Sequence, residues 1–479
     1  MSKHHTLADI IHPGRTGCTL PQLDVPMAEL PAEGQMRHEL RLPEVSEGQI
    51  VRYFTALSKQ NYALDDGLYP LGSCTMKYNP KWHEDVVRTP GFAALHPYQT
   101  AASVQGALKL MFELQQYLAE ITGMDAGCLS PMAGAQGELA CALMMKKYFQ
   151  SRGDRKRQRV LIPDSAHGTN AATAAMGGFE VGVVSSDSEG NVDLVRLKNM
   201  MSDDVAFLAL TMPTTLGLFD PSIDGIISIV HEAGGFVYGD GANMNALLGQ
   251  AKFGDMGFDC VHLNLHKTFS TPHGGGGPGA GPICVNADLE DYLPAPVVIQ
   301  YDEGKYGLSY PDKSIGAIGT FYGNFSVLVK AYAYIRSLGA EGLKAVSENA
   351  IINANYIKEK LKKYYVLPYD RPCMHEVVFS GSRQRTKGIR TLDIAKRLLD
   401  YGFHPPTVYF PLVVDEAMMI EPTETESKET LDTFVEAMQK IAEEVINDPE
   451  ILRSAPISTP VGRLDEATAA RDPDLRWEG

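Results

Sequence analysis

The sequence predicts an α/β fold with a mostly parallel central sheet and a smaller C-terminal α+β domain. Between residues 159 and 285, short apolar runs rich in Val, Ile, Phe and Tyr alternate with stretches long enough for a helix or a loop. Strands separated in this way are typical of a parallel sheet with helices on both faces. Past residue 322 the hydrophobic period is helical again, and further strand-like runs follow.

The chain begins with a segment that predicts no compact core. Prolines interrupt residues 13–43 and no long hydrophobic period is present, so we expect an extended arm over residues 1–100 with a short helix at 47–61. The 479 residues exceed the roughly 250–300 residues that one hydrophobic core supports. We therefore expect a large domain at 101–330 and a small domain with a tail at 331–479.

The elements of these two domains follow from their patterns. Helices are expected at 104–122 and 135–149, and buried strands at 159–163, 180–184, 205–211, 235–240, 260–265 and 281–285. In the small domain we expect helices at 327–338, 345–365 and 428–446 and strands at 376–380 and 408–411. Residues 425–429 carry a capping signal for the last helix.

Composition excludes several classes of protein. Hydrophobic residues make up 44% of the chain, which excludes a mainly disordered protein. The formal charge of −16 disfavours nucleic acid and anionic membranes as partners. None of the seven cysteines forms a C-x-x-C pair, so we expect free thiols. No signal peptide or bilayer-spanning segment is apparent, and we expect a cytoplasmic protein.

Lys267 is the strongest single candidate for chemistry, because it ends a buried-strand pattern. A lysine in such a place is costly unless it is paired or used. Burial disfavours the ammonium and makes the neutral amine available, as Schiff-base chemistry with an aldehyde cofactor requires. The alternative is a lysine whose stem lies along the strand and whose ammonium reaches solvent.

Asp240 ends the strand about one strand–helix–strand unit before Lys267. A pyridoxal 5'-phosphate (PLP) enzyme needs a carboxylate against the pyridine nitrogen, which keeps that nitrogen protonated. Asp240 and Lys267 would then face each other across the cofactor ring. Asp-Gly-Ala-Asn also permits a helix cap or a turn, which is the plainer reading of Asp240.

Weaker candidates occupy neighbouring strand ends and helix starts. His167 can stack on a planar heterocycle, although a lone loop histidine is more often a hydrogen-bonding residue. Thr214 offers a hydroxyl after another strand. A helix opens with backbone N–H groups suited to a phosphate at Gly134, Ala135 and Gln136. Because ligands bind at the carboxyl ends of parallel strands, the five signals together predict a PLP site.

Two further motifs resemble known binding motifs but do not predict a binding site. Gly274, Gly276 and Gly279 match G-x-G-x-x-G, but a strand rather than a helix follows, so dinucleotide binding is not expected. His262 and His266 have i,i+4 spacing on a strand-like segment without the H-E-x-x-H glutamate. We therefore predict no metal site.

The segment 263–279 around Lys267 resembles the PLP-lysine segment of glycine dehydrogenase (decarboxylating), the P-protein family of the glycine cleavage system. Further stretches that resemble this family lie at 42–47, 70–80, 133–138, 164–170, 240–243, 373–376 and 421–427. The resemblance implies the aspartate-aminotransferase type of PLP fold, fold type I. It also implies decarboxylation of glycine, with transfer of the aminomethyl group to the lipoyl group of H-protein.

The chain length matches the C-terminal half of the single-chain P-protein. The resemblance therefore implies the second chain of a two-chain form, assembled with a related subunit 1 as an α2β2 heterotetramer. Glycine would be the small-molecule substrate and lipoylated H-protein the second partner.

The resemblance also implies roles for residues. Lys267 would carry PLP as a Schiff base, Asp240 would pair with the pyridine nitrogen and His167 would stack on the ring. The remaining expected cofactor contacts are Gly134, Ala135, Gln136, Thr214, Asn243 and Thr268. A segment near the substrate entrance would include Ser73, Cys74, Thr75 and Lys77.

The sequence departs from the family at several positions. Where the family reads Thr-Asn-Pro-Asn-Thr-Leu-Gly, this chain has Met212 and Thr214, so a contact to the cofactor's phenolic oxygen would lack an amide. Met132 and Ala317 also differ, the latter standing in place of an arginine. Two alternatives therefore stay open: another PLP reaction on free amino acids, and a cofactor-poor scaffold that supports subunit 1.

Overall fold

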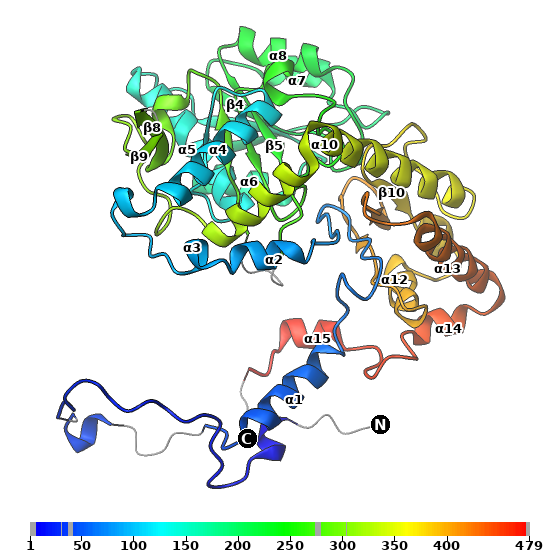
Figure 1. The fold of residues 1–479 in the computed structure, drawn as a ribbon. Coiled ribbons are helices and arrows are strands. Elements are labelled where there is room, and N and C mark those ends of the chain that lie inside the picture. The colour runs from blue at the N-terminus through cyan, green and yellow to red at the C-terminus, as the bar shows by residue number, and fades with distance from the viewer. Residues whose placement is uncertain (1–5, 30, 37–41, 274–278, 303, 476–479) are drawn as a thin grey trace. The chain divides into compact units, whose positions relative to one another are not determined.

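The computed structural model describes residues 6–29, 31–36, 42–273, 279–302 and 304–475 (Figure 1). The chain divides into two compact units, Gly67–Ile457 and Met1–Asp66 with Ser458–Gly479. The expected boundaries near residues 100 and 330 fall inside the first unit and stay a prediction.

A seven-stranded sheet forms the centre of the larger unit, with strand order β1-β7-β6-β5-β4-β2-β3. Every neighbouring pair is parallel except those that β7 makes with β1 and β6. The strands are β1 (Ala126–Cys128), β2 (Arg159–Pro163), β3 (Glu180–Val184), β4 (Val205–Thr211), β5 (Phe236–Gly241), β6 (Cys260–Leu263) and β7 (Ile283–Val285). The predicted mostly parallel sheet is confirmed, while the short β1 and the reversed direction of β7 were not predicted.

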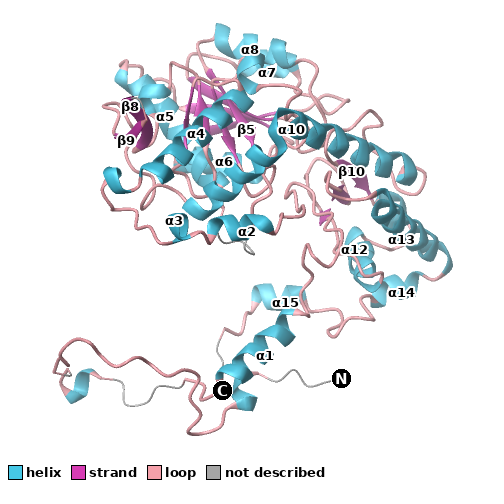
Figure 2. Cartoon of the chain, viewed as in Figure 1, coloured by secondary structure: helices cyan, strands magenta, loops and turns pink. Residues whose placement is uncertain are grey.

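Helices cover both faces of this sheet (Figure 2). They are α4 (Gln105–Thr122), α5 (Gly134–Ser151), α6 (Gly168–Met176), α7 (Leu194–Met200), α8 (Ile223–Glu232) and α9 (Phe253–Met256). Successive strand side chains point to opposite faces. In β2, Val160 and Ile162 join the core with Met144 of α5, whereas Leu161 joins the core with Leu114 of α4.

A long helix, α10 (Phe325–Leu361), links the sheet to the C-terminal part of the unit. Its first half packs in the core of the large sheet, and Ile357 and Leu361 pack in a second core. Gly339 interrupts the helical geometry with φ 61°. A break at this glycine explains why the sequence predicts two helices here.

The second core lies under a small antiparallel sheet with strand order β10-β12-β11. Its strands are β10 (Val377–Ser380), β11 (Thr407–Val408) and β12 (Ala417–Ile420), and its helices are α11 (Ser382–Arg385), α12 (Thr391–Asp400), α13 (Lys428–Asn447) and α14 (Pro449–Ser454). Ser427 caps α13 by accepting a hydrogen bond from the Thr430 backbone N–H. The predicted smaller α+β part is confirmed, although β12 was not predicted.

Short elements complete the larger unit. They are α2 (Trp82–Val87), α3 (Pro90–Ala93), the 3₁₀ helices η3 (Ala101–Ser103) and η4 (Glu290–Tyr292), and the hairpin β8 (Val297–Asp302) with β9 (Lys305–Ser309). The hairpin was not predicted. Its strands contact α4.

The smaller unit contains little regular structure. Its elements are η1 (Leu7–Ile10), η2 (Glu33–Gln35), α1 (Glu47–Ser58) and α15 (Glu466–Arg471). Ser46 and Gln49 form a capping box at the start of α1, close to the predicted helix.

Among the described residues, no helix is both long enough and apolar enough to span a membrane.

Candidate active site

A cavity of about 300 Å³ opens where β4, β5 and β6 end. Ligands of open parallel sheets bind at this edge, outside the carboxyl ends of the strands. All predicted catalytic and cofactor-contact residues except Gln136 and Thr268 line it: Gly134, Ala135, His167, Thr214, Asp240, Asn243 and Lys267. The fold thus brings together residues that lie far apart in sequence.

Lys267 follows β6 and is half-buried in the cavity wall. Its Nζ donates a hydrogen bond to the backbone carbonyl of Ser73 at 2.7 Å. Ser73 has φ 64°, in the left-handed region that a non-glycine residue rarely adopts. This strained backbone directs a carbonyl at the lysine and holds the amine in one place.

Asp240 is almost fully buried at the end of β5. Its Oδ2 accepts from Asn170 Nδ2 at 3.0 Å and its Oδ1 accepts from the Ala242 N–H at 3.1 Å. Burial alone would raise the pKa of Asp240, but His262, these two donors and Lys267 outweigh it and hold the pKa below its usual value. A charged carboxylate is therefore maintained at the back of the cavity.

Two further groups surround this carboxylate. Asn170 Nδ2 also donates to Glu138 Oε2 at 2.9 Å, so one amide joins both acids. Burial and the charge of Asp240 raise the pKa of Glu138 to about 7. His262 Nε2 lies 3.6 Å from Asp240 Oδ1, and burial lowers the pKa of His262 to about 4. The histidine is neutral and its Nδ1 lies 2.5 Å from the Tyr238 hydroxyl.

His167 caps α6 at the mouth of the cavity. Its Nδ1 accepts from the Thr169 N–H at 3.2 Å. Burial lowers the pKa of His167, so the imidazole is neutral and its ring can lie against a planar heterocycle.

Helix α5 begins at Gly134, with Ala135 next to it in the cavity wall. A Cβ on Gly134 would lie 2.3 Å from Asn264 Oδ1, which only glycine avoids. The first N–H groups of this helix suit an anion such as a phosphate. Gln136 points elsewhere: its Nε2 donates to the Ile318 carbonyl at 2.6 Å.

Three predicted cofactor contacts remain, and they differ in their burial and hydrogen bonding: Thr268, Asn243 and Thr214. Thr268 is buried, and its hydroxyl accepts from the Met244 N–H at 2.9 Å. Asn243 lines the cavity while its Nδ2 donates to Glu421 Oε1 at 2.9 Å. Thr214 is buried and borders the cavity.

The positions that depart from the family lie mostly outside the cavity. Met212 is fully buried in the large core, and Ala317 is exposed. Met132 precedes α5, and its N–H donates to Gln136 Oε1 at 2.7 Å. Of these positions only Thr214 lines the cavity.

The segment expected near the substrate entrance divides in two. Ser73 and Cys74 line the cavity, whereas Thr75 and Lys77 are 1% exposed. Lys77 Nζ pairs with Glu424 Oε1 at 2.7 Å. Burial alone would lower the pKa of Lys77, but Glu424 and Tyr334 outweigh it and raise the pKa.

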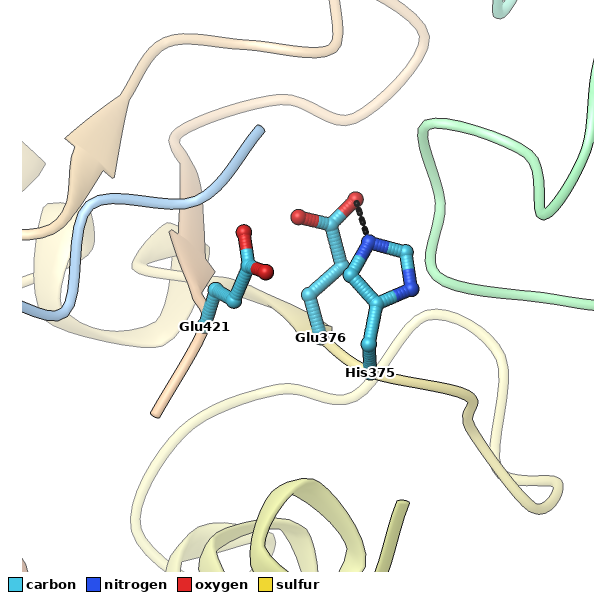
Figure 3. A group of neighbouring side chains, drawn as sticks. All are labelled: His375, Glu376 and Glu421. Carbon is cyan, nitrogen blue, oxygen red and sulfur yellow. Dashed lines mark ion pairs between the residues drawn. The ribbon is translucent and has the colours of Figure 1, made fainter. Parts of the chain in front are cut away.

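Sequence reasoning assigned no role to three buried groups beside the cavity, His375, Glu376 and Glu421 (Figure 3). Nitrogen and carboxylate oxygen atoms of the three lie within 4.8 Å of one another. His375 and Glu376 directly precede β10, and Glu421 directly follows β12. Acids placed beside buried strands are the signal that identifies such groups.

The cavity fits PLP in the chemistry of its donors. It offers an amine, a buried carboxylate, a neutral aromatic ring and a helix N-terminus. Within the described part of the chain, four atoms of its lining are buried without a hydrogen-bond partner: Thr211 Oγ1, Asn264 Oδ1, His266 Nδ1 and His375 Nδ1. Unpaired buried polar atoms are costly, and a polar ligand satisfies them. Of the glycine run, residues 274–278 lie outside the described residues.

The sequence matches two families of known proteins. Residues 21–307 match "Glycine cleavage system P-protein" and residues 346–454 match "Glycine dehydrogenase, C-terminal domain". A protein of Caldanaerobacter subterraneus subsp. tengcongensis named "Probable glycine dehydrogenase (decarboxylating) subunit 2" is 57% identical over 97% of this chain and 96% of its own length. A protein of the same name from Halalkalibacterium halodurans is 57% identical over 100% and 99%.

Solved structures share the fold. A glycine decarboxylase (P-protein) of the glycine cleavage system, in inhibitor-bound form, aligns with a TM-score of 0.71 at 19% identity over 86% of this chain and 93% of that chain. A sphingosine-1-phosphate lyase of Burkholderia pseudomallei aligns with a TM-score of 0.65 at 14% identity over 88% and 95%. The fold is thus the expected fold type I. The chain belongs to the glycine cleavage system P-protein family, within its glycine dehydrogenase (decarboxylating) subunit 2 group.

Proposed function

We propose that this chain is the PLP-bearing subunit of a glycine decarboxylase. It removes CO₂ from glycine and passes the aminomethyl group to the lipoyl group of H-protein, in an α2β2 assembly with subunit 1 in the cytoplasm. Membership of the subunit 2 group supports the reaction. The single observation that carries the assignment is the cavity that places Lys267, Asp240 and His167 together.

When bound, PLP supplies an electron sink for the pair released as the C–COO⁻ bond breaks. Asp240 would hold the pyridine nitrogen protonated, because its buried carboxylate stays charged. Asn170 fixes the orientation of that carboxylate and keeps a second acid, Glu138, beside it. This arrangement would hold one proton at the pyridine nitrogen.

Lys267 would hold the cofactor through its amine. The Ser73 carbonyl orients the lysine amine through the 2.7 Å hydrogen bond. The ring of His167 would lie on one face of the cofactor, and the N–H groups of Gly134 and Ala135 would bind its phosphate. These contacts would restrict the substrate to one face of the ring and exclude water from the reacting bond.

The test is the exchange of labelled bicarbonate into the carboxyl group of glycine by this chain co-expressed with subunit 1. We expect exchange that depends on lipoylated H-protein and that disappears in Lys267→Ala. Exchange by the Lys267→Ala protein would contradict the mechanism. Turnover of free amino acids without H-protein would favour a different PLP reaction, and failure to bind PLP would favour a scaffold role.

A further inference from the structure

Glu376, which lines the cavity, and Glu421 form a buried pair of acids (Figure 3), and each accepts from a backbone N–H of residues 73–75. The Ser73 N–H donates to Glu376 Oε2 at 2.8 Å, and the Thr75 N–H donates to Glu421 Oε2 at 3.0 Å. Both donors have positive φ, 64° for Ser73 and 49° for Thr75. Backbone strain of this kind persists only where the surroundings enforce it, and it concentrates at functional sites.

The two acids differ in how many donors stabilise their charged form. Glu421 accepts from the Thr75 N–H, from Thr75 Oγ1 at 2.8 Å and from Asn243 Nδ2 at 2.9 Å. Glu376 accepts from the Ser73 N–H, and this hydrogen bond and the charge of Lys267 are what favour its charged form. Hydrogen bonds to a carboxylate favour its charged form, so a negative charge settles on Glu421 and a proton settles on Glu376.

The pKa values of the pair follow the same order. Burial and then the charge of Glu421 raise the pKa of Glu376 well above its usual value. Burial raises the pKa of Glu421 to about 7, and its donors oppose that rise. Two acids whose surroundings drive their pKa values apart are a recurrent sign of acid and base roles.

The neighbouring titratable groups do not replace Glu376 as a proton donor. His375 Nε2 lies 3.6 Å from Glu376 Oε1, and burial lowers the pKa of His375 to about 3, so its imidazole carries no extra proton. Burial raises the pKa of Cys74, which keeps it a weakly acidic thiol. The amine of Lys267 donates to the Ser73 carbonyl and, in the proposed function, would hold the cofactor.

The proposed reaction consumes one proton. The C–COO⁻ bond of glycine breaks and releases CO₂, its α-carbon forms a C–S bond with one sulfur of the lipoyl disulfide, and the S–S bond breaks. Glycine loses two electrons, which reduce the disulfide. The second sulfur leaves as a thiolate, and it takes up one proton to become a thiol.

We propose that Glu376 is the general acid that delivers this proton to the departing lipoyl sulfur. The assignment rests on the proposed function. Glu376 lines the same cavity as Lys267 and is joined to it through one residue, since Ser73 accepts from Lys267 and donates to Glu376. The other two acids of the described lining, Glu138 and Asp240, are committed to each other through Asn170. After turnover Glu376 regains its proton from solvent.

The test compares Glu376→Gln with the wild type, each assembled with subunit 1 and loaded with PLP. Glutamine keeps the acceptor for the Ser73 N–H but cannot supply a proton. We expect kcat for H-protein-dependent CO₂ release to fall about 100-fold or more. The spectral change on adding glycine, and the glycine concentration that gives half of it, should be unchanged. We expect the wild-type kcat to fall at alkaline pH, where Glu376 loses its proton, and we expect Glu376→Gln to lack this fall.

Two control variants make the outcome decisive. Glu426→Gln alters a glutamate outside the cavity lining and should keep the wild-type kcat and pH profile. Glu376→Asp should regain part of the lost rate, because it restores a carboxylic acid. A Glu376→Gln protein with wild-type kcat and alkaline limb would overturn the assignment, as would one that no longer binds PLP or glycine. If the wild type itself releases no CO₂, the proposed function fails instead.

Discussion

The amine of Lys267 and the backbone carbonyl of Ser73 are joined by a hydrogen bond of 2.7 Å, although they lie on distant parts of the chain. Ser73 reaches this position only with φ 64°. The cost of a left-handed backbone at a non-glycine residue is roughly 1–2 kcal/mol. A loop that maintains such strain orients the lysine more tightly than an unstrained turn would.

Two substitutions of Ser73 separate backbone geometry from the hydroxyl. Ser73→Gly removes the hydroxyl but adopts the positive φ freely, so we expect kcat/KM for glycine within about threefold of the wild type. Ser73→Val removes the hydroxyl and adds a β-branched side chain that resists this φ. We expect it to lower kcat/KM at least tenfold. Equal losses in both variants would show that the hydroxyl matters and the backbone does not.

Gly134 offers a test of the helix start. A Cβ at this position would meet Asn264 Oδ1 at 2.3 Å, so Gly134→Ala must displace Asn264 or the first turn of α5. We expect PLP to bind at least tenfold more weakly, as measured by absorbance titration of the apoprotein. Gly168→Ala is the matched control, because a Cβ on this helix-opening glycine meets nothing within 4 Å. If Gly134→Ala bound PLP with unchanged affinity, the start of α5 would not be part of the phosphate site.

Lys77 and Glu424 provide a stability prediction away from the cofactor. Lys77 is 1% exposed, and its Nζ lies 2.7 Å from Glu424 Oε1. Lys77→Met leaves the carboxylate buried without its cation, so we expect a loss of about 3–5 kcal/mol in the free energy of unfolding. The double variant Lys77→Met/Glu424→Leu should regain part of this loss. Urea denaturation measures both, and additive losses would mean that the two groups do not interact.

Much of the fold follows from local sequence patterns. The predicted strands 159–163 and 205–211 coincide with β2 and β4, because a buried strand is a continuous apolar run. The predicted strand 180–184 coincides with β3, but its expected burial is wrong, since β3 is an edge strand and most of its residues are exposed. The strand β1, Ala126–Cys128, carries no such signal, since three small residues pair only because β7 lies beside them. Its existence depends on tertiary contacts.

The candidate site shows the same division. Lys267, Asp240 and His167 are recognisable because each lies at the end of a strand, or shortly after one, at one edge of the sheet. Glu376 and Glu421 come from the small sheet and meet the 73–75 loop across about 300 residues of chain. No periodicity or spacing connects segments so far apart, so the pairing of these acids appears only in the folded structure.

A last prediction concerns pH and stability. Burial raises the pKa of Glu426 from its ordinary value of 4.5 to about 7. Between pH 4.5 and 7 the unfolded chain has released the Glu426 proton, whereas the folded chain still holds it. The contribution of Glu426 to the free energy of unfolding is therefore greatest below pH 4.5 and is lost as the pH rises to about 7. Glutamine cannot ionise. We therefore compare the free energy of unfolding of Glu426→Gln with that of the wild type at each pH. We expect this difference to shift in favour of the variant by about 1–3 kcal/mol between pH 4.5 and pH 8. Urea denaturation of both proteins at the two pH values measures this shift. A stability difference between variant and wild type that does not change with pH would contradict the raised pKa of Glu426.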